Sequence, residues 1–191
     1  MKPVLTVTAA LLSAALFISG CNTASQMASM GVPSDFARSP VLDSKPHWRT
    51  VVLPPSSPTE SSEVNNENLM DYAGLALLRT GKFTLVDRSV VDQLLDEQEF
   101  SYSGVVDQST AVELGRLLGA EAVMTIRVSS ISHDGFWDDE PDQRDAGILV
   151  KIVSVETSEV LYTSTGEGSS FNGAEDALRM AMEVALIGLF K

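Results

Sequence analysis

Hydrophobic and polar residues follow different periods along this chain, and each period predicts a type of secondary structure. Apolar residues at helical spacing predict helices over about 65–79, 89–98, 110–118 and 174–190. Alternating or β-rich runs predict strands over about 47–53, 83–86, 122–129, 148–155 and 160–164. The predicted order of elements is therefore β-α-β-α-α-β-β-β-α.

This order predicts the fold class. Strands that alternate with helices favour parallel pairing, whereas consecutive strands favour an antiparallel meander. The sequence therefore predicts one α/β domain, in which a mixed β-sheet carries flanking helices. The last helix has only a narrow polar stripe, so we expect it to lie buried on the sheet or to pack partly on another subunit.

Three local signals predict where elements begin and end. Gly81 follows the first helix and suits the left-handed conformation that closes a helix. Thr110 and Glu113 have the spacing of a capping box, which predicts a helix start there. Residues 156–159 separate two strands and predict a hairpin turn.

The amino-terminal segment has the pattern of a secretory signal peptide. Lys2 precedes an apolar run from Val4 to Ile18, and the small residues Ser19 and Gly20 follow. The run is shorter than the ~20 residues that a membrane-spanning helix needs. A cleavable signal peptide over residues 1–20 is therefore expected.

Cys21 is the one cysteine of the chain and directly follows this signal. The sequence from Ile18 to Cys21 resembles the bacterial lipobox, with Ile18 where leucine is usual. The resemblance implies that Cys21 is acylated, with palmitate among its lipids, and anchors the protein in a membrane. Asn22 in place of an aspartate favours the outer membrane, with the protein facing the periplasm. An unlipidated signal peptide and an amino-terminal membrane helix are the alternatives.

The remaining chain divides into a tether and a domain. Residues 21–46 are rich in Ser, Ala, Pro and Met and show no sustained period, which predicts a flexible tether. The folded domain is expected over residues 47–191. With a single cysteine, no disulfide within the chain can stabilise this domain.

Charge and side-chain chemistry narrow the function. Asp and Glu outnumber Lys and Arg by 26 to 13, so nucleic acid would repel the chain. His47 and His133 lie far apart, and neither a phosphate-binding loop nor a nucleophile elbow occurs. The sequence therefore predicts no enzyme, no cofactor and no metal.

The loop near residues 134–145 offers two further readings. Its carboxylates are the one candidate for Ca²⁺, but they lack the spacing and glycine of an EF-hand. Phe136 and Trp137 lie in this polar loop and are candidate contacts for a protein partner. They could equally fold back onto the sheet edge.

Residues 83–98, 109–124 and 150–161 resemble the curli-secretion (CsgG-like) lipoprotein family. The shared pattern is a strand ending in Asp-Arg, a helix, a helix ending in Leu-Gly-Ala, and a strand with a hairpin. The resemblance implies the α/β fold and a tendency to form homo-oligomers. The pore-forming hairpins of the curli member have no counterpart here, since neither 99–108 nor 133–145 offers a pair of ~9–11-residue strands. The scaffold also resembles lipoprotein activators of penicillin-binding proteins.

Two classes of function follow. The first is an oligomeric assembly or secretion accessory, anchored in the outer membrane, which binds other cell-envelope proteins. The second is a regulatory binding module, such as an activator of a peptidoglycan synthase. An enzyme or a Ca²⁺-dependent binding protein is the third and weakest hypothesis.

Overall fold

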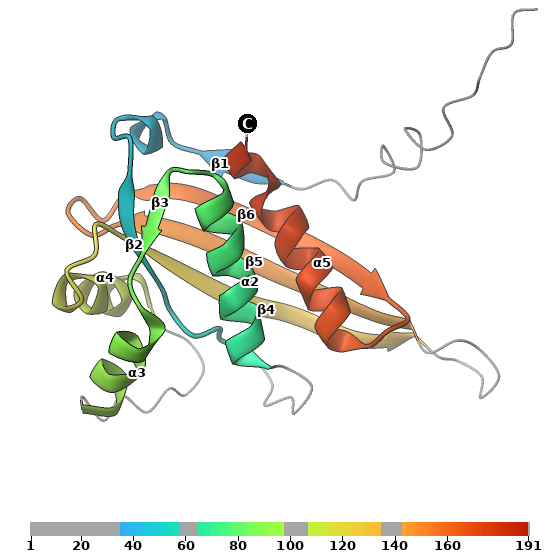
Figure 1. Ribbon diagram of the computed structural model, residues 1–191. Coiled ribbons are helices and arrows are strands. Elements are labelled where there is room, and N and C mark those ends of the chain that lie inside the picture. Colours follow the sequence, from blue (N-terminus) through green and yellow to red (C-terminus); the bar gives the residue numbers. More distant parts are fainter. Residues whose placement is uncertain (1–34, 58–64, 98–106, 135–142, 191) are drawn as a thin grey trace, which may run out of the picture. The chain divides into compact units, whose positions relative to one another are not determined.

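Six strands form one mixed sheet in the order β1-β6-β5-β4-β2-β3 (Figure 1). The computed structural model describes residues 35–57, 65–97, 107–134 and 143–190. The strands are β1 (Phe36–Arg38), β2 (Trp48–Val52), β3 (Phe83–Leu85), β4 (Ala122–Asp134), β5 (Gln143–Ser154) and β6 (Val160–Ser170). β2 pairs in parallel with β3 and β4, and the other pairs are antiparallel. The predicted mixed α/β sheet is confirmed.

Helices cover the two faces of this sheet unequally. They are α2 (Asn66–Arg79), α3 (Arg88–Glu97), α4 (Gln108–Leu117) and α5 (Ala174–Leu186), with short 3-10 turns η1 (Pro40–Asp43) and η2 (Ile187–Phe190). α2 and α5 lie in front of the sheet in Figure 1, and their buried residues join the larger apolar core. α3 and α4 contribute to a second, smaller core. All described residues belong to one compact unit, so the single domain is confirmed.

The sheet begins before the predicted boundary at residue 47. β1 lies within the range expected to be tether and pairs with β6, from Phe36 opposite Ser164 to Arg38 opposite Tyr162. The rings of Phe36 and Tyr162 stack with centroids 6.2 Å apart. A strand of three residues is too short to show a period of two, so only its partner strand reveals it.

The predicted capping box at Thr110 is wrong. Asp107 is the N-cap of α4, and its Oδ1 accepts a hydrogen bond from the Thr110 backbone N–H at 2.9 Å. The helix therefore begins at Gln108, and Thr110 lies inside its first turn. Two other local predictions are confirmed: Gly81 has a φ of 69°, and β5 and β6 are joined by a turn in which Ser158 has a φ of 61°.

Glycine allows α5 to lie directly on β6. A Cβ atom on Gly166 would lie 2.1 Å from the backbone oxygen of Ala181, and one on Gly168 would lie 2.2 Å from that of Ala177. The Tyr162 hydroxyl donates a hydrogen bond to the Ala185 carbonyl at 2.6 Å in the same interface. The expected burial of the terminal helix on the sheet is confirmed.

Candidate partner-binding groove

A groove with a volume of about 480 Å³ lies between α2, the end of β3 and the start of α3. Its walls are mainly apolar, and carboxylates stand at its rim. The residues on which its shape and charge depend are Asp71, Gly74, Leu75, Leu78, Leu85 and Asp87.

The apolar wall of the groove comes from α2. The Asn65 side chain caps this helix by accepting hydrogen bonds from the Glu67 and Asn68 N–H groups at 3.0 and 3.1 Å. One stripe of the helix is buried in the larger core. Leu75 and Leu78 lie beside that stripe and are 48% and 51% exposed. α2 therefore has one apolar flank packed on the sheet and a second that faces the groove.

The close approach of α2 to β3 depends on a glycine. A Cβ atom on Gly74 would lie 3.0 Å from Cδ1 of Leu85, which is tight for a side chain at that position. Leu85 is itself partly exposed, so it belongs both to the sheet and to the groove. The groove thus lies directly beside the last strand of the sheet.

β3 presents a free backbone edge. The Trp48 N–H donates to the Lys82 carbonyl at 2.8 Å, and the Val86 N–H donates to the Thr50 carbonyl at 2.9 Å. Because backbone groups alternate in direction along a strand, Phe83 and Leu85 turn their N–H and C=O groups away from β2. Within the described residues, these groups have no hydrogen-bond partner. Such an edge can pair with a further strand.

The rim of the groove carries negative charge. The Ser89 hydroxyl and N–H donate to Oδ1 of Asp87 at 2.5 and 2.8 Å and lower the pKa of that carboxyl. Nη2 of Arg88 lies 2.6 Å from Glu67, and its Nε lies 3.4 Å from Asp92, so two carboxylates already surround this cation. The exposed carboxylate of Asp71 adds to the negative charge.

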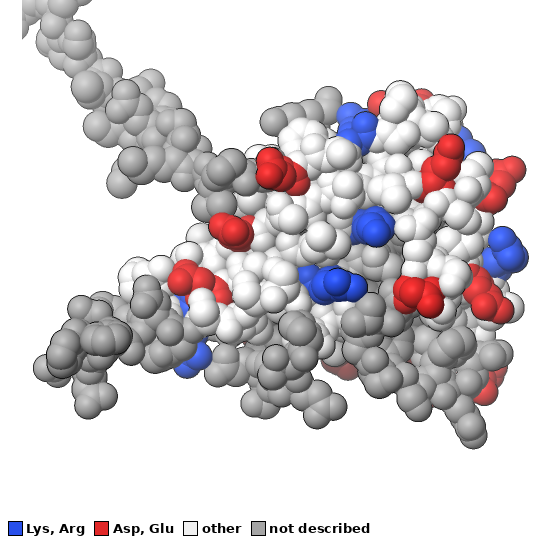
Figure 2. All heavy atoms as spheres, turned by 180° about the vertical axis from the view of Figure 1, so that it is seen from behind, with Lys and Arg blue, Asp and Glu red and all other residues white. Residues whose placement is uncertain are grey.

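A second surface lies on the opposite face of the sheet, over β4, β5 and β6. Figure 2 shows this side, where basic groups stand among uncharged side chains. Arg127 and Lys151 project from alternate positions of β4 and β5, and neither has an ion-pair partner among the described residues. Small hydroxyl-bearing residues surround them, including Thr125, Thr163 and Thr165. The surface is polar.

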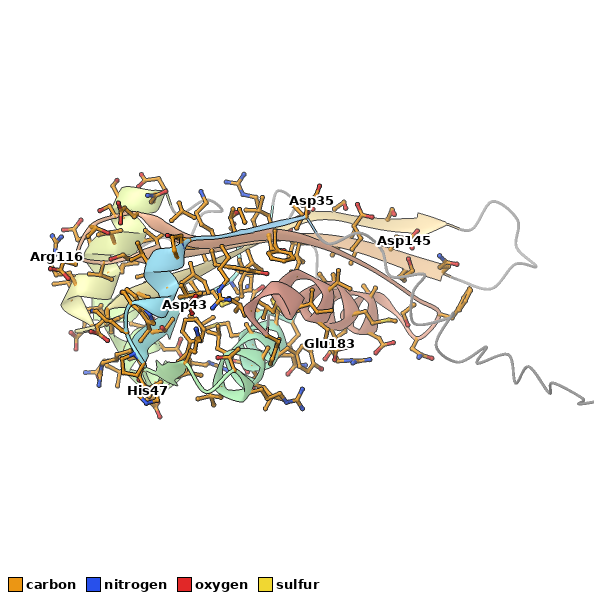
Figure 3. The ribbon with its side chains drawn as sticks, turned by 90° about the horizontal axis from the view of Figure 1, so that it is seen from above. Asp35, Asp43, His47, Arg116, Asp145 and Glu183 are labelled. Atoms are coloured by element: carbon orange, nitrogen blue, oxygen red, sulfur yellow. The ribbon has the colours of Figure 1, made fainter. Side chains whose placement is uncertain are left out.

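A third site is a smaller pocket of about 320 Å³ with balanced charge. Lys45 lies 2.9 Å from Glu121, and Arg116 and Glu156 also line the pocket. Hydrogen bonds from the Arg49 N–H and from Lys45 lower the pKa of Glu121. Figure 3 shows Arg116 on α4 and Asp43, the last residue of η1, towards the same end of the molecule. This pocket offers neither an apolar wall nor an excess of one charge.

The structure describes few of the residues that the sequence singled out. Cys21, Phe136 and Trp137 lie outside the described residues, as does most of the acidic loop. Asp145 is a residue of β5, and the Gln143 amide donates to its carboxylate at 3.1 Å. Nδ1 of His47 lies 3.2 Å from the carbonyl oxygen of Gly81. His133 belongs to β4, far from His47 in the sequence.

The described residues offer neither a metal-binding cluster nor a membrane-spanning helix. They contain no group of three or more His, Cys, Asp or Glu side chains placed to hold a metal ion. They also contain no helix long and apolar enough to cross a membrane.

The sequence did contain a signal for the groove. Leu69, Leu75, Leu77 and Leu78 are spread over more than one face of α2, which is wider than a single buried stripe requires. Only the packing of the helix shows which leucines stay outside. The free edge of β3 had no signal in the sequence, because it depends on the order of strands.

Comparison with solved structures finds chains that share this fold. The PelC dodecamer from Paraburkholderia phytofirmans is 12% identical, with 83% of this chain and 96% of that chain covered and a TM-score of 0.55. Lipoprotein GNA1162 from Neisseria meningitidis is 14% identical, with 73% and 95% covered and a TM-score of 0.55. At these identities the likeness shows a shared fold. A comparison with curated protein sequences gives no significant match.

The family follows from the sequence match. The model of the peptidoglycan-synthase activator LpoB matches residues 39–167, from η1 to within β6. The chain therefore belongs to the LpoB family. The LpoB C-terminal domain from Salmonella enterica is 20% identical, with 66% of this chain and 84% of that chain covered and a TM-score of 0.48.

This family corrects the resemblance to CsgG-like lipoproteins, which was wrong. The shared strand–helix–helix–strand pattern belongs to the scaffold and does not distinguish the two families. Of the two functional hypotheses, membership in a family of synthase activators favours the regulatory binding module over the secretion accessory.

Proposed function

We propose that this protein activates a peptidoglycan synthase by binding to it from an anchor in the outer membrane. The observation that carries the proposal is the match of residues 39–167 to the model of peptidoglycan-synthase activators. The matched range includes every element that lines the groove. The protein would act through contact alone and would itself catalyse no reaction.

Activation by contact needs a surface that binds one state of the synthase better than another. The groove supplies apolar walls, a free strand edge and charged rims, which are features of a protein-binding surface. Two of its charged groups are held in place, Arg88 by ion pairs and Asp87 by hydrogen bonds from Ser89. This supports recognition of a protein over chemistry on a small substrate.

The lipid on Cys21 is the proposed anchor. Because β1 begins at Phe36, only about 14 residues separate the anchor from the sheet. Fully extended, they span at most about 50 Å. Changing Cys21 to Ala should release the protein from the membrane fraction. Retention there would show that a second membrane contact exists.

Phe136 and Trp137 remain a proposed second contact with the partner. They lie between the ends of β4 and β5, which pair as far as Asp134 and Gln143. Homo-oligomerisation also remains a prediction. The similar PelC structure is a dodecamer, and light scattering on the purified full chain measures whether this protein assembles.

The proposal is tested with the full chain purified in detergent and a purified peptidoglycan synthase from the same organism. We expect the full chain to bind the synthase and to raise its rate of glycan polymerisation several-fold. A matched lipoprotein of unrelated fold serves as the control. Equal rates with and without the chain, together with no binding, would contradict the proposal.

A further inference from the structure

We infer that the groove and the free edge of β3 together bind an extended segment of the synthase in which apolar and basic residues alternate. This inference rests on the proposed function and names the contact through which it operates. Three features of the described residues support it: the strand edge, the continuous apolar wall and the charge of the rim.

The first feature is the position of the strand edge. Phe83 and Leu85 direct their unpaired N–H and C=O groups outward, which is the pattern that an added strand requires. A strand paired there would lie about 4.8 Å from β3. Its alternate side chains would point to the same face of the sheet as Leu85, which is the face that α2 covers.

The second feature is the apolar wall above that edge. Leu75 and Leu78 line the groove from α2, and Leu85 lines it from β3. Every second side chain of the added strand would therefore meet leucine side chains. Burial of these side chains among the leucines would fix the register of the added strand, because a shift by one residue would turn them away from the groove.

The third feature is the charge of the rim. Asp71 of α2 and Asp87, which follows β3, both line the groove. The pKa of Asp87 is lowered by its hydrogen bonds from Ser89, so this carboxylate stays charged under mildly acid conditions. Lys or Arg side chains of the bound segment would pair with these carboxylates.

Charge also argues against other occupants. Residues 22–34 of this chain contain no Lys or Arg, so this segment lacks cations that could pair with the carboxylates of the rim. A second copy carries a net charge of −13 and would bring its own Asp71 and Asp87 towards the same rim. Like charges placed opposite each other destabilise a complex.

The main test compares two leucines of similar exposure. Leu78 lines the groove and is 51% exposed, whereas Leu117 lies at the end of α4, outside the groove, and is 57% exposed. Leu78→Glu should weaken binding of the purified synthase at least about tenfold and abolish activation, and Leu117→Glu should change neither. Thermal melting of both variants serves as the control for folding, and each should melt near the wild-type temperature.

Two further measurements separate the features. Asp71→Lys should weaken binding about threefold, and the loss of affinity should be larger at low salt, where charges are screened less. The control variant Asp96→Lys, on the exposed side of α3, should leave binding unchanged. Hydrogen exchange of the Phe83 and Leu85 amides should slow when the synthase binds. Unchanged exchange at both amides would overturn strand addition.

The outcomes distinguish the inference from the function it rests on. If the wild-type chain neither binds nor activates the synthase, the proposed function fails and the inference with it. If the wild-type chain activates the synthase and Leu78→Glu activates it equally well, only the inference fails. Self-association that Leu78→Glu abolishes would assign the groove to a second copy and would also overturn the inference.

Discussion

The two faces of the sheet differ in how completely helices cover them. On one face, α2 and α5 cover the strands, and the buried residues form a continuous apolar core. On the other, α3 and α4 cover one end, and the strands β4, β5 and β6 expose polar residues beyond it. The first face therefore contributes most of the buried apolar contacts of the fold, whereas the second leaves part of the sheet exposed.

Length explains the incomplete cover of the second face. α4 has 10 residues and is about 15 Å long, whereas β4 has 13 residues and is about 40 Å long. One short helix therefore cannot cover the outer parts of the three long strands. Polar residues such as Arg127 and Lys151 occupy the part that remains exposed. The groove lies elsewhere, between α2, the end of β3 and the start of α3.

The largest change in stability is expected when a glycine that faces α5 is replaced. Gly168 of β6 faces α5, whereas Gly147, one rung away on β5, faces the opposite side of the sheet. Gly168→Ala should lower the free energy of unfolding by about 3 kcal/mol, because its Cβ would meet the backbone of α5. Gly147→Ala should change it by less than about 1 kcal/mol, because its Cβ would meet the side-chain oxygens of Ser129 and Ser130, which can rotate away. Urea unfolding measures both, and equal costs would contradict the difference between the faces.

A smaller change in the free energy of unfolding is expected at Tyr162, on the covered face. Tyr162→Phe removes the hydrogen bond to the Ala185 carbonyl and should cost about 1 kcal/mol. Burial also raises the pKa of Tyr162. The unfolded chain therefore ionises first as the pH rises above about 10, and stability falls there. The Phe variant should lose less stability than the wild type over this alkaline range, and an identical loss would contradict the role of burial.

The smallest effect is expected on the exposed part of the second face. The double variant Arg127→Glu with Lys151→Glu should change the free energy of unfolding by less than about 0.5 kcal/mol, since neither side chain has an ion-pair partner among the described residues. Activation of the synthase should be unchanged. Loss of activation without loss of stability would place the contact on this face and not in the groove.

Most elements could be predicted from the sequence, because their signals are local. Apolar spacing indicated α2 and α5, and Gly81 marked the end of a helix in the conformation that the structure shows. β1 was missed because three residues carry no period, and Asp107 was missed because Thr110 offered a competing cap. The outer parts of β5 and β6 were missed because Ser, Thr, Gly and charged residues occupy them.

The candidate site was less predictable than the fold. Leu75 and Leu78 could be recognised as apolar helix residues, but their exposure depends on how α2 lies across the sheet. Phe136, Trp137 and Cys21 remain predictions from the sequence. The family assignment came from the chain as a whole, over residues 39–167, and replaced a resemblance based on shorter stretches.

The period of most elements, the negative charge of the chain and the family to which it belongs can all be read from the amino-acid sequence. These properties depend on residue type and spacing, which are local or additive. The tertiary structure alone decided that β3 is the edge strand, that α2 has an open apolar flank and that two carboxylates border the space between them. These properties depend on contacts between segments far apart in the chain, because the order of strands determines which backbone groups remain unpaired.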